Sequence, residues 1–277
     1  MHDCPQVWPT DLGYDETYQS VLSSLTRLRS DKVHLVLLHW PDCLPEVSWL
    51  RCNDMKRPGA TWKESWRALE RLYAEGAALS IGVANFDSSQ LQSLIDFARV
   101  GPHVVQNWFD PIHVDLPLLD LAASHQIIVQ AYSPLRQITE LGSDFAYSGA
   151  RRELAHVARA TGRDAHQIVL RWLLDLDPGL TLLVRSSSPM HLQRNLDVWS
   201  WTLPLPHLGH RLLAPYIARG VVRSDCPNDY SLRRTFSCCS HFLRFVPFPL
   251  KQGDLPPSIW FQILLSCHPL CGRAYAM

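Results

Sequence analysis

A chain of 277 residues with 47% hydrophobic and 19% charged residues is long enough for one large domain and too apolar to be disordered. The 26 basic residues balance the 26 acidic ones, which argues against a surface for binding nucleic acid. The apolar runs are too short to cross a bilayer, and residues 1–13 lack the basic and apolar regions of a signal peptide, so we expect no membrane association.

The eight cysteines are unevenly distributed, with five beyond Gly220 and none in the middle of the chain. Because a disulfide scaffold would spread its cysteines through the fold, we expect a reducing compartment and a cytoplasmic protein. Two groups in the tail resemble zinc ligands: Cys238-Cys239 with His241, and Cys267-His268 with Cys271. Their spacings match no common zinc site, so we expect no metal.

Helices and strands are predicted to alternate after a loop over residues 1–14. Helical spacing of apolar residues and capping residues predict helices over about 15–29, 61–75, 87–100, 117–125, 150–160, 164–175 and 189–196. Short apolar runs predict strands over 34–39, 79–83, 104–106, 127–132 and 180–184. A proline-rich loop is expected over 41–60.

The segment His34–Trp40 is the most informative of these elements. Its four consecutive aliphatic residues predict a strand that is buried on both faces. His39 follows at the carboxyl end of this strand, the position at which a parallel barrel keeps its active site. An isolated histidine there would more simply be a core residue, but four later strands also end in polar residues.

This alternation predicts an α/β fold with a parallel sheet. Five strands are too few for a closed barrel, which needs eight. We therefore expect residues 1–203 to form a partial (β/α)8 TIM barrel that lacks its first two to three strands and is open on one side. Residues 204–277 lose periodicity, and we expect a divergent, irregular tail.

The sequences at the strand ends carry a family resemblance. LVLLHWPD, SIGVANF, VVQNWFDP, QAYSPL and LLVRSS, the last followed by RN, occur in the order and spacing of the aldo-keto reductase superfamily. VWPTDLGYDETYQSVLSSLTRL also resembles that family, and the resemblance covers about Val7 to Leu203. Each motif is weak alone, but five in order are strong. The resemblance implies an NADPH-dependent reductase of small carbonyl compounds.

Site residues follow from the resemblance, position by position. His39 resembles the catalytic histidine that orients the substrate carbonyl. The implied cofactor contacts are Asn85 and Gln106 for the nicotinamide carboxamide, Tyr132 for ring stacking, Ser133 and Leu135 for the pyrophosphate, Arg185 and Ser186 for the 2′-phosphate, and Asn195 for adenine. Outside this series of motifs, Asn85 and Gln106 would be ordinary polar groups at strand ends, and Arg185 an ordinary surface charge.

Trp8 and Trp40 are candidates for lining the substrate pocket, although packing in the core or at the rim explains them equally well. Several positions depart from the family pattern: Ala84 stands in place of serine and His191 in place of a basic residue. The catalytic Asp, Tyr and Lys of the family have no counterparts here, and Gln6 stands where the resemblance places the Lys.

Two functions remain open from the sequence. The first is an NAD(P)H-dependent oxidoreductase that reduces aldehydes, ketones or sugars as a monomer, with impaired turnover because the proton donor is absent. The alternative is a catalytically inactive remnant that binds nucleotide or a partner and derives from an atypical gene or splice model.

Overall fold

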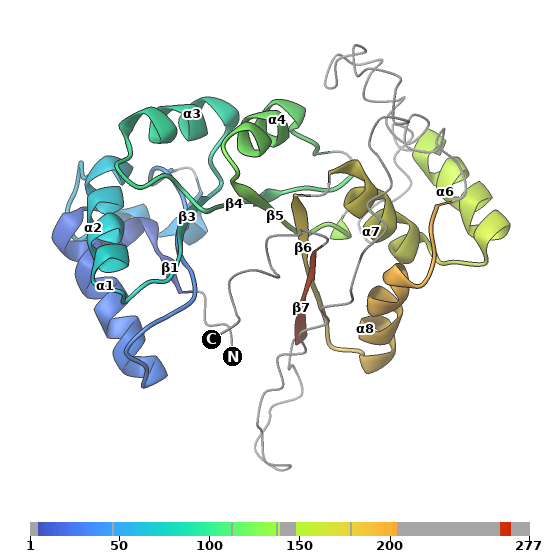
Figure 1. The fold of residues 1–277 in the computed structure, drawn as a ribbon, viewed down its shortest axis with the longest axis horizontal. Coiled ribbons are helices and arrows are strands. Elements are labelled where there is room, and N and C mark those ends of the chain that lie inside the picture. The colour runs from blue at the N-terminus through green and yellow to red at the C-terminus, as the bar shows by residue number, and fades with distance from the viewer. Residues whose placement is uncertain are drawn as a thin grey trace. The chain divides into compact units, whose positions relative to one another are not determined.

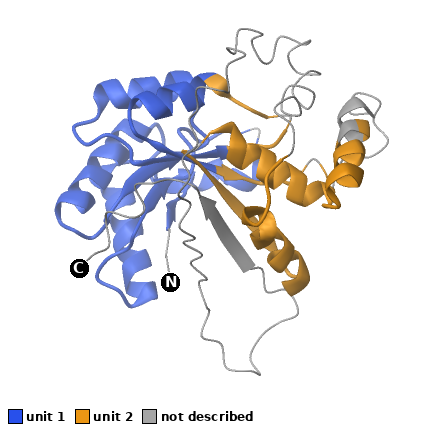
Figure 2. Ribbon diagram, turned by 45° about the vertical axis from the view of Figure 1, so that its right-hand side comes forward, with its two compact units in different colours: residues 1–107, 117–130 blue, residues 108–116, 131–277 orange. Residues whose placement is uncertain are grey.

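A computed structural model describes residues 5–45, 47–111, 113–136, 138, 148–177 and 179–203, together with the backbone of 261–266. The chain divides into two compact units (Figure 2). Unit 1 comprises residues 1–107 and 117–130, and unit 2 comprises residues 108–116 and 131–277.

Unit 1 is built on parallel strands that follow one another in the sheet in chain order. The strands are β1 (Gln6–Val7), β2 (Val36–Leu38), β3 (Ile81–Ala84), β4 (Val104–Trp108) and the first part of β5 (Ile128–Tyr132). Leu37 lies opposite Gln6 on one side and Gly82 on the other, and Gly82 in turn lies opposite Val104. The parallel arrangement predicted for the strands at 34–39, 79–83 and 104–106 is therefore confirmed.

Helices cover the strands of unit 1 on one side (Figure 1). They are α1 (Tyr14–Leu28), α2 (Trp62–Ala74), α3 (Ser88–Phe97) and α4 (Leu116–Ser124), with single 3-10 turns at Pro9–Asp11, Ser48–Leu50 and Cys52–Asp54. A capping box between Thr61 and Glu64 begins α2, and another between Asp87 and Gln90 begins α3. In each box a side chain satisfies a backbone N–H that the helix leaves unpaired.

Unit 2 contains the end of β5, then α6 (Ser148–Thr161), α7 (Ala165–Leu176), β6 (Leu180–Ser186), α8 (Pro189–Leu196), a 3-10 turn at Asp197–Trp199 and β7 (Phe261–Ser266). Strand β7 pairs antiparallel with β6, from Ser186 opposite Phe261 to Thr181 opposite Ser266. No helix in the described part of the chain is long and apolar enough to cross a membrane.

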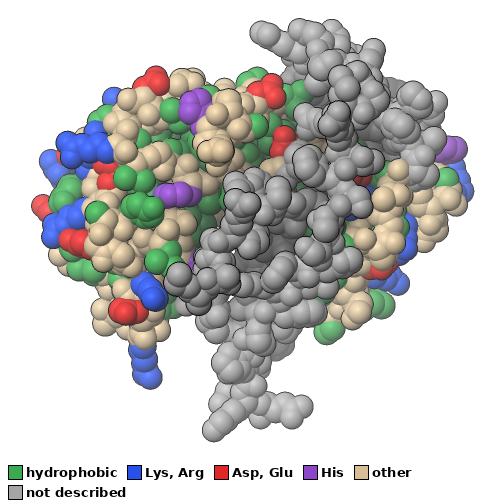
Figure 3. All heavy atoms as spheres, viewed as in Figure 1, with side chains coloured by type: hydrophobic (Ala, Val, Ile, Leu, Met, Phe, Trp, Pro, Cys, Tyr) green, Lys and Arg blue, Asp and Glu red, His purple; other side chains and the backbone are tan. Residues whose placement is uncertain are grey.

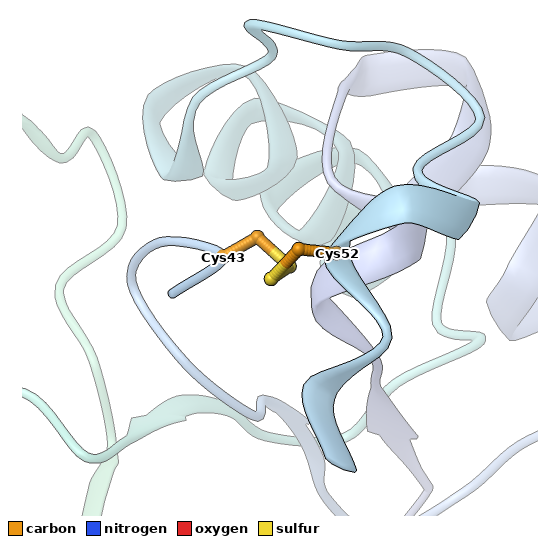
Figure 4. Close-up of a disulfide and its surroundings, with 2 residues drawn as sticks. All are labelled: Cys43 and Cys52. Atoms are coloured by element: carbon orange, nitrogen blue, oxygen red, sulfur yellow. A yellow bond between two sulfur atoms is a disulfide. The ribbon is translucent and has the colours of Figure 1, made fainter. Parts of the chain in front are cut away.

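Three features differ from the sequence-based expectations. Strand β1 lies in the segment 1–14, which was predicted to be a loop. The sequence did not indicate this strand because a run of two residues is too short to show periodicity. Strand β7 lies within the tail expected to be irregular; the rest of that tail, with both possible zinc groups, lies outside the described residues. Cys43 and Cys52 form a disulfide with a Cα–Cα distance of 5.5 Å, which the expectation of a reducing compartment did not include (Figure 4).

A side-chain hydrogen bond shows how strongly the sheet of unit 1 curves. Gln6 on β1 donates from Nε2 to Oε1 of Gln106 on β4 over 3.0 Å. Three strand spacings separate β1 from β4, and a flat sheet would place them roughly 14 Å apart. Two glutamine side chains meet over that interval only if the strands curl toward each other, as barrel strands do.

Gly82 provides a test of the packing inside this curve. A Cβ at residue 82 would collide with the backbone carbonyl of Val104 and would lie 2.8 Å from a methyl carbon of Leu37. We expect Gly82→Ala to lower the free energy of unfolding by about 1–3 kcal/mol, as overpacking does. Gly101→Ala is the matched control, because nothing lies within 4 Å of its added Cβ. Urea unfolding of both variants measures the difference, and equal stabilities would contradict the close approach.

Glu70 on α2 joins this helix to the segment that precedes β4. Its Oε1 accepts from the backbone N–H groups of Arg99 at 2.6 Å and Val100 at 3.0 Å, and its Oε2 accepts from Arg67 at 2.6 Å. Burial opposes ionisation of Glu70, but the hydrogen bonds from Val100, Arg67 and Arg99 outweigh it and lower the pKa.

This pKa shift gives a prediction for acid stability. A carboxyl group with a lowered folded-state pKa stabilises the fold above its unfolded-state pKa of about 4.3 and loses that contribution as the pH falls through the folded-state pKa. Glu70→Gln should therefore be less stable than the wild type at pH 7, and the difference should shrink toward pH 3. Asp96→Asn, at an exposed position on α3, is the control. Thermal unfolding of the wild type and of both variants from pH 3 to 7 measures these stability differences. A difference between Glu70→Gln and the wild type that does not change with pH would contradict the assigned role of the Glu70 carboxylate.

Candidate active site

Three predicted site residues lie along one edge of the strands of unit 1. His39 directly follows β2, Asn85 directly follows β3, and Gln106 belongs to β4. In a parallel sheet the carboxyl ends of neighbouring strands meet at one edge, where α/β enzymes keep their active sites. The strand order therefore brings together residues that are far apart in the sequence.

Asn85 ties the ends of these three strands to one another. Its side-chain Nδ2 donates to the backbone carbonyl of His39 at 2.8 Å, and its backbone N–H donates to the carbonyl of Gln106 at 3.0 Å. The residue adopts a left-handed φ of 60°, which asparagine tolerates better than most residues. Asn85 thus fixes the strand end that carries His39.

Gln106 lies in the middle of a row of three amide side chains. It accepts from Gln6, and its Nε2 donates to Oε1 of Gln130 at 3.0 Å. The residue is only 9% exposed, so its amide orientation is set by these neighbours. A primary amide has two N–H groups and two acceptor lone pairs, so Gln106 keeps one of each for a further partner.

The His39 ring lies in an apolar, half-buried environment. Burial lowers the pKa of His39 below its ordinary value, so the imidazole is neutral at pH 7. Its buried Nδ1 makes no hydrogen bond to the described part of the protein, and neither does the buried Nε1 of Trp40. A neutral imidazole carries one N–H donor and one acceptor nitrogen, which suits it to hold an uncharged carbonyl group.

Three tryptophans surround His39, and we call Trp8, His39, Trp40 and Trp49 the aromatic cluster. The ring centroid of His39 lies 4.6 Å from that of Trp8, 6.1 Å from Trp49 and 6.5 Å from Trp40. Trp8 and Trp40 are thus placed beside the candidate catalytic residue. Trp49 was not predicted, because it lies in a loop without periodicity; its position between two cysteines was the only available signal.

The predicted cofactor residues of unit 2 form a second group. Tyr132 ends β5 and is half-buried; burial raises the pKa of its hydroxyl, and the charge of Arg136 partly opposes this. The carbonyl of Tyr132 accepts from the backbone N–H of Phe109 at 3.4 Å. Ser133 follows with a left-handed φ of 54°, and its side chain is exposed, whereas Leu135 is partly exposed.

The end of β6 and the start of α8 carry the remaining candidates. Arg185 is exposed, and the Oγ of Ser186 accepts from the backbone N–H of Ser188 at 3.1 Å. Ser188 is also the N-cap of α8. Asn195, near the other end of this helix, is only 5% exposed. A basic side chain, a hydroxyl and a helix amino terminus together suit a phosphate group.

Unit 2 also contains a polar cluster at the end of the VVQNWFDP motif, to which the family resemblance assigned no role. Trp108 stacks on His113 with ring centroids 3.9 Å apart, and Nδ1 of His113 lies 3.0 Å from Oδ1 of the fully buried Asp110. The guanidinium carbon of Arg136 lies 4.9 Å from the Trp108 ring centroid. Asp110 also accepts from the backbone N–H of His113, so the pair is explained by the local turn.

The described residues provide no group of three or more His, Cys, Asp or Glu side chains arranged to hold a metal ion. On the face drawn in Figure 3, basic and acidic side chains are interspersed over the described surface. This distribution matches the zero formal net charge of the sequence.

Comparison with known proteins places the chain in a family. The model of the aldo/keto reductase family matches residues 3–206. The uncharacterized oxidoreductase YtbE of Bacillus subtilis is 32% identical over 198 residues, which are 72% of this chain and 61% of that protein. Glyoxal reductase of the same organism is 31% identical, with coverage of 72% and 62%. The chain therefore spans about three fifths of the length of these relatives.

Solved structures of aldo-keto reductases also resemble this chain in fold. A thermostable aldo-keto reductase, Tm1743, bound to the inhibitor epalrestat, has a TM-score of 0.65 and 27% identity, covering 78% of this chain and 71% of that one. A mutant of Gox0644 in complex with NADPH has a TM-score of 0.61 and 27% identity, with coverage of 76% and 69%. By sequence and by fold, the chain belongs to the aldo/keto reductase family.

Proposed function

We propose that this protein is an NADPH-binding oxidoreductase that reduces the carbonyl group of a small aldehyde, ketone or sugar. The observation that carries the proposal is the bonded set of His39, Asn85 and Gln106 at one edge of parallel strands. Relatives named glyoxal reductase and methylglyoxal reductase support a carbonyl substrate.

The cofactor residues of unit 1 suit a nicotinamide carboxamide. Gln106 keeps one donor and one acceptor beyond its bonds to Gln6 and Gln130, which are the two functions that a carboxamide partner needs. Asn85 holds the neighbouring strand end through the carbonyl of His39. The bound cofactor would supply the hydride, while these residues bind and orient its carboxamide.

Unit 2, taken by itself, carries residues that suit parts of a nucleotide. Tyr132 offers a half-buried aromatic face for stacking, and Ser133 and Leu135 follow it at the end of β5. Arg185 and Ser186 shortly precede α8, and a guanidinium binds a phosphate with paired hydrogen bonds. We therefore propose that the 2′-phosphate of NADPH binds there, with Asn195 on the adenine side. We also propose a cytoplasmic monomer.

Slow turnover is the second part of the proposal. Gln6 stands where the family resemblance places a lysine, and it is a neutral amide bonded to Gln106. A glutamine cannot raise the acidity of a proton donor as an ammonium can. His39 would orient the carbonyl in its neutral form. It would deliver the proton only in its charged form, which is scarce at pH 7 because burial lowers its pKa.

The neutral character of the glutamine row favours a second candidate function, a nucleotide-binding protein without turnover. Gln6 and Gln130 hold the Gln106 amide as part of a neutral hydrogen-bonded row. Such a row can bind a carboxamide but offers no group that titrates. Cofactor binding without carbonyl reduction would select this candidate.

Arg185→Ala tests the assignment of the 2′-phosphate. We expect the dissociation constant for NADPH to rise about tenfold or more, because a charge-assisted bond of roughly 1.5–3 kcal/mol is lost. Affinity for NADH, which lacks this phosphate, should change little. Quenching of tryptophan fluorescence measures both, with Arg159→Ala on the exposed face of α6 as the control. Equal losses for the two nucleotides would contradict the assignment.

The pH dependence of turnover tests the role of His39. If the imidazolium delivers the proton, activity is present at low pH and falls as the pH rises through the folded-state pKa, which burial places below about 6.5. His39→Gln keeps hydrogen-bonding capacity but should abolish this residual activity. Steady-state assays with NADPH and 4-nitrobenzaldehyde provide the profile.

An exposed histidine supplies the control: His125→Ala should leave the profile unchanged. A turnover number in the ordinary range of ~1–10³ s⁻¹ at pH 7 would show that another group is the acid.

A further inference from the structure

We propose that Trp49 selects flat aromatic carbonyl compounds at His39, and that the Cys43–Cys52 disulfide holds Trp49 in place, so that reducing this bond opens access to His39. The selection of carbonyl compounds rests on the proposed function. The control of access to His39 does not, because it concerns only residues of unit 1.

Trp49 contacts the other members of the aromatic cluster while remaining open to solvent. Its ring centroid lies 6.1 Å from His39, 6.1 Å from Trp8 and 5.9 Å from Trp40. Yet 52% of its surface is exposed, a large fraction for a tryptophan with three aromatic neighbours. A large apolar ring in this position leaves part of its surface available to a ligand beside His39.

Local geometry explains how a loop residue is kept there. Trp49 belongs to the 3-10 turn Ser48–Leu50, which the N–H of Leu50 closes onto the carbonyl of Val47. The next side chain, Leu50, is fully buried and anchors the turn to the core. Two residues further on, Cys52 is bonded to Cys43 (Figure 4). Cys43 lies three residues after Trp40 in the sequence.

The disulfide therefore links the two ends of the loop that carries Trp49. Without it, Leu50 and backbone hydrogen bonds remain, but the start of the loop is no longer tied to its end. Disulfides in reducing compartments are usually transient and act as redox sensors. Both cysteines are partly exposed, so a reductant can reach the bond.

Opening is a two-electron step with a dithiol as reductant. One thiolate of the dithiol attacks a sulfur of the disulfide, breaking the Cys43–Cys52 bond and forming a mixed disulfide. The second thiolate of the reductant then displaces the remaining cysteine. Cys43 and Cys52 end as thiols with two added protons, and the dithiol ends as a cyclic disulfide.

The accessibility of His39 can be measured without any turnover. Diethyl pyrocarbonate modifies neutral imidazole, and mass spectrometry of the His39 peptide separates this residue from the other histidines. We expect Trp49→Ala to speed modification of His39 by roughly two- to tenfold, the factor that corresponds to losing an aromatic contact. Trp49→Phe should restore most of the protection, and Leu79→Ala, another exposed apolar side chain, should have no effect.

Reduction provides the independent arm of the test. Dithiothreitol should speed His39 modification in the wild type and in the Leu79→Ala control. The Cys43→Ser, Cys52→Ser double variant should be fast from the start and show no further response, although the other cysteines remain. If that variant does not fold, the reduced wild type still provides the test. Circular dichroism then shows whether the reduced protein remains folded while the modification of His39 is measured. Unchanged modification of His39 after verified reduction would overturn the control of access.

Protection of His39 from modification by added aldehydes tests whether Trp49 selects aromatic carbonyl compounds. 4-Nitrobenzaldehyde should slow His39 modification in the oxidised wild type and in Trp49→Phe, but not in Trp49→Ala. Propanal, a small aliphatic aldehyde, should protect all three equally. Equal protection by 4-nitrobenzaldehyde in all three proteins would overturn selection by Trp49. Absence of NADPH turnover would instead count against the proposed function and would leave the control of His39 by Trp49 standing.

Discussion

Burial of β2 between two parallel neighbours is the constraint on which unit 1 depends. Val36, Leu37 and Leu38 are fully buried, and burying an aliphatic side chain of this size stabilises a fold by about 1.5–3 kcal/mol. A strand buried on both faces can turn polar only at its ends, and β2 does so at His39. The position of the candidate catalytic residue is therefore a consequence of core packing, and Gly82 keeps β3 close enough to maintain it.

The row of polar side chains inside the curved sheet of unit 1 is made of neutral groups. Gln6, Gln106 and Gln130 satisfy one another in a row, and His39 is kept uncharged by burial. Neutral amides inside a curved sheet avoid the cost of burying charge, and they leave hydrogen-bonding capacity for an uncharged carboxamide. In the function that we propose, the same neutrality leaves no charged group at Gln6 to assist proton delivery. The proposed cofactor binding and the proposed slow turnover thus have one physical cause.

The loop after β2 adds a different kind of constraint. Its turn is fixed by one buried leucine and one disulfide, and between these anchors Trp49 reaches the ring of His39. A covalent bond that closes a short loop stabilises the folded arrangement mainly by restricting the unfolded chain. The order of this loop therefore rests on a covalent bond as well as on the burial of Leu50.

Sequence alone determined the succession of helices and strands from α1 to α8 and the family resemblance, because apolar periodicity and strand-end motifs are local signals. It also indicated His39, Asn85 and Gln106. Contacts between distant segments required the tertiary structure: the pairing of β1 with β2, the bond from Gln6 to Gln106, the disulfide, and the approach of Trp49 to His39. Strand β7 was missed for the same reason, since its pairing with β6 joins segments that no local pattern connects. Curvature of the sheet decides which side chains meet, and no short window of sequence records that curvature.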